Sequence, residues 1–137
     1  MPPPLRPSMT SQGSAQGRFQ RAIRARNLWD ATIAAHELGH VSLGNALALT
    51  LLTAEVGDDR WPRAAARWLG RFIIESPAIT IGEAGLAAAA IQELAGGGRG
   101  VAAETLRQLA STHGHSTVAA LLEPPAKALR PGERRLR

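Results

Sequence analysis

The sequence lacks cysteine and tyrosine and contains only two phenylalanines, three tryptophans and one lysine, at position 127. Without cysteine neither a disulfide nor a thiolate metal site can form, and this composition agrees with a reducing cytosol. No segment shows the period-two alternation of a β-strand. No secretory-type apolar stretch is present, and the longest uncharged central run, 41–54, is too short to cross a bilayer. These absences predict a cytoplasmic, all-α protein without a membrane segment.

Apolar residues make up 45% of the chain, and many of them are alanine. The core must therefore consist mostly of leucine and isoleucine, with alanine allowing helices to approach closely. The formal net charge is +5, and nearly all the positive charge is arginine. A basic balance permits nucleic acid or acidic partners, but only the placement of the charge on the surface argues for either.

Apolar periodicity and capping residues predict a compact bundle of about six short antiparallel helices. Asn27, Ser42 and Thr80 are predicted N-caps, and Thr80 forms a capping box with Glu83. Residues 1–16 are predicted to be a disordered tail, 17–113 a single helical domain, and 114–137 a basic, mostly disordered tail in which only 117–122 looks foldable. The expected helices cover 17–26, the segment from residue 28 into the HELGH string, 43–55, 60–75, the segment from Thr80 to 94, and 101–112.

The string His36-Glu37-Leu38-Gly39-His40 matches H-E-x-x-H, in which two histidines one helical turn apart bind zinc and the glutamate activates a water. Zinc also needs a third protein ligand, and no longer signature supplies one. Gly39 and Ser42 are helix stop and start signals, so the helix is expected to end before His40. The candidates for a third ligand, among which the sequence does not choose, are Glu55, Glu75, Glu83, His113 and His115.

Two resemblances accompany these segments. Over AAHELGHVSLGN the chain resembles the ImmA-like, zincin-type metallopeptidases, which implies a zinc peptidase with His36 and His40 as ligands and Glu37 as the catalytic base. The segments RFQRAIxxxNLxxA, AxELGHVSLxxALALTLL and RAAARWLGRFIIE resemble a group of small, uncharacterised all-α actinobacterial proteins, over about residues 18–112. In that group arginine commonly stands at the position of His36. The second resemblance therefore implies no metal, activity, ligand or partner.

A row of arginines, spaced at i, i+3, i+7 and i+11, follows one side of the expected helix 60–75. Such a ridge suits phosphates, although solvated arginines paired with nearby acids are the commoner outcome and no nucleic-acid motif accompanies them. The row consists of Arg60, Arg63, Arg67 and Arg71.

From these observations we predict a non-catalytic protein-interaction or structural module without a cofactor, whose partner is another protein or a second copy of the chain. A zinc-dependent metallopeptidase using His36, Glu37 and His40 is one alternative. An accessory nucleic-acid-binding protein using the arginine row is the other.

Overall fold

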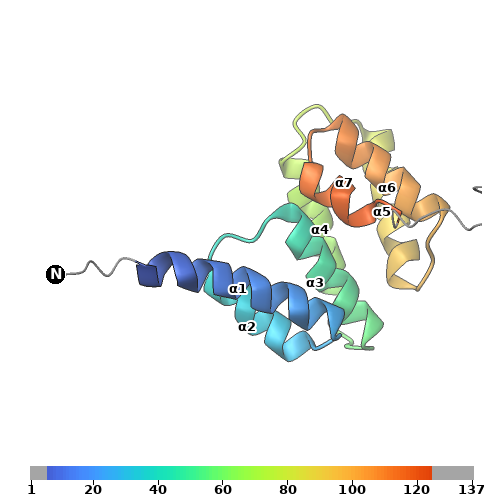
Figure 1. The fold of residues 1–137 in the computed structure, drawn as a ribbon. Helices are drawn as coiled ribbons and strands as arrows, with labels where there is room; N and C mark the ends of the chain where they lie inside the picture. Colours follow the sequence, from blue (N-terminus) through green and yellow to red (C-terminus); the bar gives the residue numbers. More distant parts are fainter. Residues whose placement is uncertain (1–5, 125–137) are drawn as a thin grey trace, which may run out of the picture.

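The computed structural model describes residues 6–124, and the side chains of residues 15–124. This part of the chain is all-α and forms a helical bundle without strands, as predicted, but it contains seven helices instead of six (Figure 1). None of these helices combines the length and apolar composition needed to cross a membrane. They are α1 Arg6–Arg24, α2 Leu28–Leu38, α3 Leu43–Glu55, α4 Trp61–Ile74, α5 Ile81–Ala95, α6 Val101–Thr112 and α7 Ser116–Leu122.

The bundle has two packed clusters, which meet at α3. Helices α1 and α2 lie side by side as a hairpin (Figure 1). The core of this hairpin includes Phe19 and the alanines of α2, and Leu52 of α3 packs into it. Helices α3 to α7 form the second cluster, in which Leu47, Phe72 and Leu106 are fully buried. One helix therefore supplies side chains to both cores.

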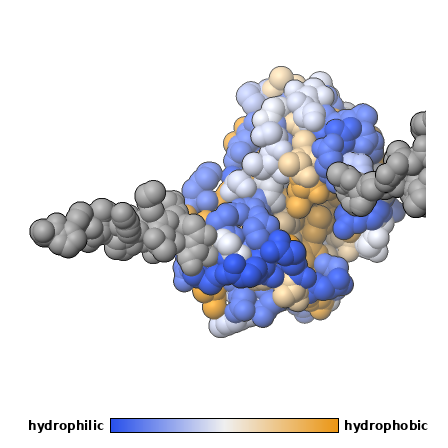
Figure 2. Space-filling model, viewed as in Figure 1, coloured by the Kyte–Doolittle hydropathy of each residue, from blue (hydrophilic) through white to orange (hydrophobic). Residues whose placement is uncertain are grey.

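Helix α3 is apolar on most of its surface, which explains its central place. Leu47 faces the larger cluster and Leu52 faces the hairpin, and both are buried. Further apolar residues of the helix, Ala46, Leu49 and Leu51, are only half-buried. Figure 2 shows an apolar strip on the viewed face along the middle of the molecule, in the region where Figure 1 places α7 and α3. The flanking helices therefore leave part of the apolar surface of the molecule uncovered.

The predicted N-caps are all present. The side-chain oxygens of Asn27 and Ser42 each accept a hydrogen bond of 3.0 Å from a backbone N–H three residues later. Thr80 and Glu83 form both bonds of the capping box, at 3.1 and 3.0 Å. Each bond satisfies an N–H group that the first helical turn leaves without an intrahelical partner. Local sequence signals therefore determine where these three helices begin.

The predicted chain divisions need two corrections. Helix α1 begins at Arg6 rather than at residue 17, and Ala15 is buried one turn before Phe19, so burial of this helix begins upstream of the predicted start. Helix α7 lies within the predicted tail 114–137, yet its Val118 is fully buried in the larger cluster. The helical domain therefore extends beyond residue 113. Residues 1–5 and 125–137 of the predicted tails lie outside the described residues.

Helix α7 is held against α3 by a backbone contact at Gly44. The N–H of Gly44 donates a 3.0 Å hydrogen bond to Thr117 Oγ1. A methyl carbon on Gly44 would lie 2.6 Å from the carbonyl oxygen of Thr117 and 2.8 Å from its Cβ. Only glycine fits here, because the obstructing atoms include backbone.

We expect Gly44→Ala to lower the free energy of unfolding by about 1–3 kcal/mol, the usual cost of overpacking a core. The matched control is Gly70→Ala in α4, where nothing lies within 4 Å of the added methyl group. That change should raise the free energy of unfolding by up to about 1 kcal/mol, because alanine is the better helix former. Urea unfolding of the two variants measures both effects. If Gly44→Ala proved as stabilising as Gly70→Ala, the result would contradict the close approach of α3 and α7 at Gly44.

Candidate functional site

The HELGH string does not lie on one continuous helix. Helix α2 ends at Leu38, and Gly39 follows with φ +79° and ψ −74°. His40 lies in the loop beyond the helix and is exposed, as is His36. The structure therefore does not give the two imidazoles the one-turn spacing on a helix on which the zinc motif depends.

The remaining members of the zinc hypothesis make other contacts. Glu37 forms an ion pair with Arg18 of the neighbouring helix α1. His36 Nδ1 lies 3.1 Å from the carbonyl oxygen of Thr32. Of the candidate third ligands, Glu55 pairs with Arg26 at 2.7 Å. In the part of the chain that the structure describes, no three histidine, aspartate or glutamate side chains gather around a common point suited to a metal.

The arginine row on α4 divides into paired and unpaired members. Arg60 binds both carboxylate oxygens of Asp58, through bonds of 3.0 and 2.7 Å, and its guanidinium lowers the pKa of Asp58 to about 2. Arg71 Nε donates to Glu75 at 2.7 Å. Arg63 and Arg67 are exposed and form no ion pair within residues 15–124.

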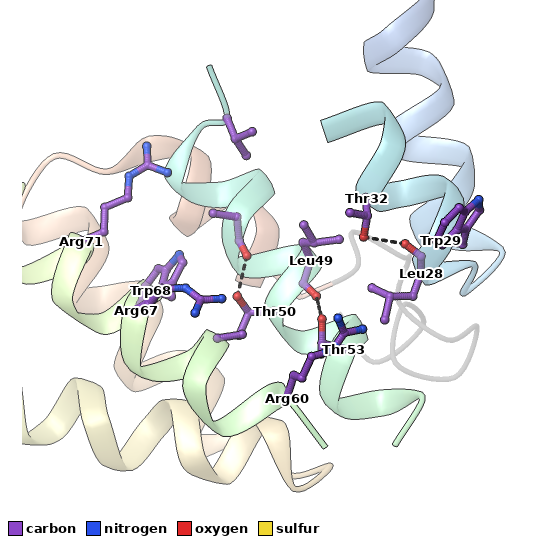
Figure 3. A pocket seen from close by; sticks show the side chains of 13 residues that line it. Leu28, Trp29, Thr32, Leu49, Thr50, Thr53, Arg60, Arg67, Trp68 and Arg71 are labelled. Atoms are coloured by element: carbon purple, nitrogen blue, oxygen red, sulfur yellow. Dashed lines mark hydrogen bonds between the residues drawn. The ribbon is translucent and has the colours of Figure 1, made fainter. Parts of the chain in front are cut away.

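A groove of about 650 Å³ lies between α2 and α4, and α3 forms its floor. This size is within the range of about 300–1,000 Å³ that is typical of ligand pockets. Figure 3 shows Leu28 reaching from α2 towards the side of α3 that carries Leu49 and Thr53, and Arg67 reaching from α4 towards Thr50. Trp29 lies on the outer side of α2. The groove is lined by Leu28, Trp29, Thr32, Val41, Ala46, Leu49, Thr50, Thr53, Arg60, Ala64, Arg67, Trp68 and Arg71.

Most polar groups in the lining already have partners inside the chain. The hydroxyls of Thr32, Thr50 and Thr53 each donate to the carbonyl oxygen one turn earlier, at 2.7–2.8 Å. The indole N–H of Trp68 donates to the carbonyl oxygen of Leu43 at 2.9 Å. Trp29 is different, because it is 75% exposed. The groove therefore offers a mostly apolar surface, an exposed aromatic ring and the guanidinium groups of its α4 wall.

The structure also brings together a serine and a histidine that are far apart in the sequence. His115 Nε2 lies 2.8 Å from Ser76 Oγ, and Ser76 donates its own proton to the carbonyl oxygen of Phe72 at 2.6 Å. His115 Nε2–H is therefore the donor to Ser76. Ser76 is fully buried, so its oxygen is closed to a substrate. The pair connects the end of α4 to the start of α7 and has a structural role.

Sequence reasoning identified the arginine row but missed the groove that three of its members line. Arg63, the fourth member, is outside the lining. One available signal was the exposed apolar face of α2, where Trp29 and Ile33 remain 75% and 42% exposed. Apolar residues on the outer face of a helix indicate a surface that another segment or protein can cover. The sequence does not reveal that α4 lies across the groove from α2.

Comparisons with protein-family models, curated proteins and solved structures gave no match for this chain. The resemblances to metallopeptidases and to small actinobacterial proteins therefore stay predictions.

The contact between the buried Ser76 and the half-buried His115 leads to a prediction for the pH dependence of stability. Burial lowers the pKa of His115 below its usual 6.5; the nearby Glu75 carboxylate opposes this shift, and His113 adds to it. The unfolded chain thus binds a proton more readily than the folded chain as pH falls through 6.5, and stability falls with it. We expect the urea midpoint to drop between about pH 7.5 and about pH 5.5. His115→Asn should show a smaller drop; an equal drop would assign the effect to other groups.

The geometry of the HELGH string leads to a prediction about zinc binding. Because α2 ends before His40, zinc added to the tag-free protein should not bind in a one-to-one complex that depends on this string. Competition with a zinc-sensitive dye measures the binding of the native chain and of His36→Ala and His40→Ala. One zinc per chain, lost in both variants, would restore the metallopeptidase alternative.

Proposed function

We propose that this chain is a non-catalytic protein-interaction module that binds an amphipathic helix of a partner protein in the groove between α2 and α4. The observation that carries this proposal is the uncovered side of α3. Helical segments bind such grooves by laying apolar residues at i, i+3, i+4 and i+7 against the floor. Here the floor contains Ala46 and Leu49, and Leu28 and Ala64 form the walls.

The exposed indole of Trp29 adds to this argument. Tryptophan is enriched among the residues that contribute most to protein interfaces. Trp29 stands at the edge of the groove and packs into neither core cluster of the described chain. Its ring lies on the outer side of α2 (Figure 3), where it is exposed and can extend the contact with a partner beyond the groove.

The two alternatives receive less support. The metallopeptidase needs a helical histidine pair and a third ligand, which the described residues do not provide. The nucleic-acid hypothesis needs the arginine row to act as a single charged ridge, whereas Arg60 and Arg71 are paired with acids of this chain. A groove with an aliphatic floor is better suited to leucine side chains than to phosphates.

Blocking the groove tests the proposal. The probe is a fluorescein-labelled peptide of about 18 residues, or five helical turns, with one leucine-alanine face and glutamine elsewhere. We expect it to bind the native chain and to bind Ala64→Trp at least about tenfold more weakly, because the new indole fills the groove. Fluorescence anisotropy measures both affinities.

The matched control is Ala89→Trp, which places the same side chain on the exposed surface of α5, outside the groove. It should bind the peptide like the native chain. Thermal unfolding confirms that both variants are folded. Equal binding by the native chain and Ala64→Trp would contradict a binding site between α2 and α4.

A further inference from the structure

We propose that the helix bound in the groove is acidic along the edge that faces α4, and that Arg67 determines this preference. The inference rests on the proposed function and adds the chemistry of the partner. It starts from the charge of the lining, which contains three arginines and no aspartate or glutamate.

The three arginines differ in the charge that they can offer. The Arg60 and Arg71 side chains already have the carboxylates of Asp58 and Glu75 beside them. Arg67 lies between them, is exposed, and has no acidic partner within residues 15–124. Figure 3 shows its side chain extending from α4 towards α3, over the floor of the groove. The unbalanced positive charge of the lining is therefore centred on Arg67.

Apart from the exposed indole N–H of Trp29, the remaining side-chain donors of the lining already have partners within the chain. The three lining threonines donate their hydroxyl protons within their own helices, and Trp68 donates to the carbonyl oxygen of Leu43. Hydrogen bonds between a guanidinium and a carboxylate are stronger than those between neutral groups. A carboxylate is consequently the polar group that this lining binds best.

The spacing of the arginines indicates an extended partner. From Arg60 to Arg71 the row covers about 16 Å along α4, at roughly 1.5 Å per residue. A compact anion is held by donors that converge on it, whereas these guanidiniums are spread along a line. A helix lying beside α4 can place carboxylates at the same intervals while its apolar face contacts Leu49 and Ala46.

The chain itself does not supply this acidic helix. Segment 125–137 contains five basic residues and one glutamate, so its charge has the wrong sign for the groove. Segment 1–5 contains no acidic residue. The net charge of +5 also opposes association between copies. The partner is therefore an acidic amphipathic helix of another protein.

The experiment compares peptides with the same leucine-alanine face and with glutamate, glutamine or lysine at the flanking positions. The glutamate peptide should bind the native chain roughly fivefold more tightly than the glutamine peptide, the size expected of one well-placed, partly exposed ion pair. Arg67→Glu should reverse the order, so that the lysine peptide binds best. Arg63→Glu is the matched control, because it makes the same charge change on α4 outside the lining, and it should keep the native order.

Each remaining outcome overturns a specific step. If the glutamate and glutamine peptides bind equally and Ala64→Trp weakens both, the proposed preference for an acidic partner is wrong, whereas the binding site between α2 and α4 is supported. If Ala64→Trp changes nothing, the proposed function fails as well. A single-stranded DNA of about 18 nucleotides serves as the third probe. If DNA binds more tightly than the glutamate peptide, and Arg63→Glu and Arg67→Glu weaken it equally, the row is a nucleic-acid surface.

Discussion

Helix α3 is apolar on most sides, and this single constraint organises the structure around it. An apolar helix has to bury its surface against several neighbours, because one partner covers only one stripe. The α1–α2 hairpin covers the side that carries Leu52, and α4 and α7 cover the side that carries Leu43 and Leu47. The two buried threonines of α3 fit this environment because each hydroxyl donates to a carbonyl oxygen of the same helix.

The groove follows from the same constraint. The hairpin and α4 both pack on α3, yet they do not close over its remaining side, and a space of about 650 Å³ is left between them. Its floor and walls come from three helices and a loop, so no single stretch of sequence contains it. Closing the hairpin onto α4 would bury the guanidinium of Arg67 against apolar side chains, and desolvating this charge without an acidic partner is costly. The charge on Arg67 thus helps to keep the groove open.

Features that depend on neighbouring residues could be predicted from the sequence, and features that depend on distant pairs could not. The caps at Asn27, Ser42 and Thr80 and the end of α2 at Gly39 follow local rules, and all were predicted correctly. The burial of α7 depends on the backbone contact between Gly44 and Thr117, residues 73 positions apart. A glycine near a helix start and a short apolar segment near the end of a chain do not identify each other in a sequence. For this reason α7 was assigned to the tail.

The two sequence motifs illustrate why spacing alone does not define a site. His36 and His40 have the spacing of a zinc pair, but the backbone leaves the helix between them. Three arginines of the row lie on α4 and Arg60 precedes its first residue, yet acids of this chain pair with Arg60 and Arg71 and leave Arg67 unbalanced in the groove. Binding strength would then come from apolar contact with α3 and Trp29, and selectivity from the charge at Arg67, since charged groups at an interface contribute more to specificity than to affinity. A neutral partner would fit the same floor but leave Arg67 without a carboxylate, and under the proposed function this difference would make the groove selective.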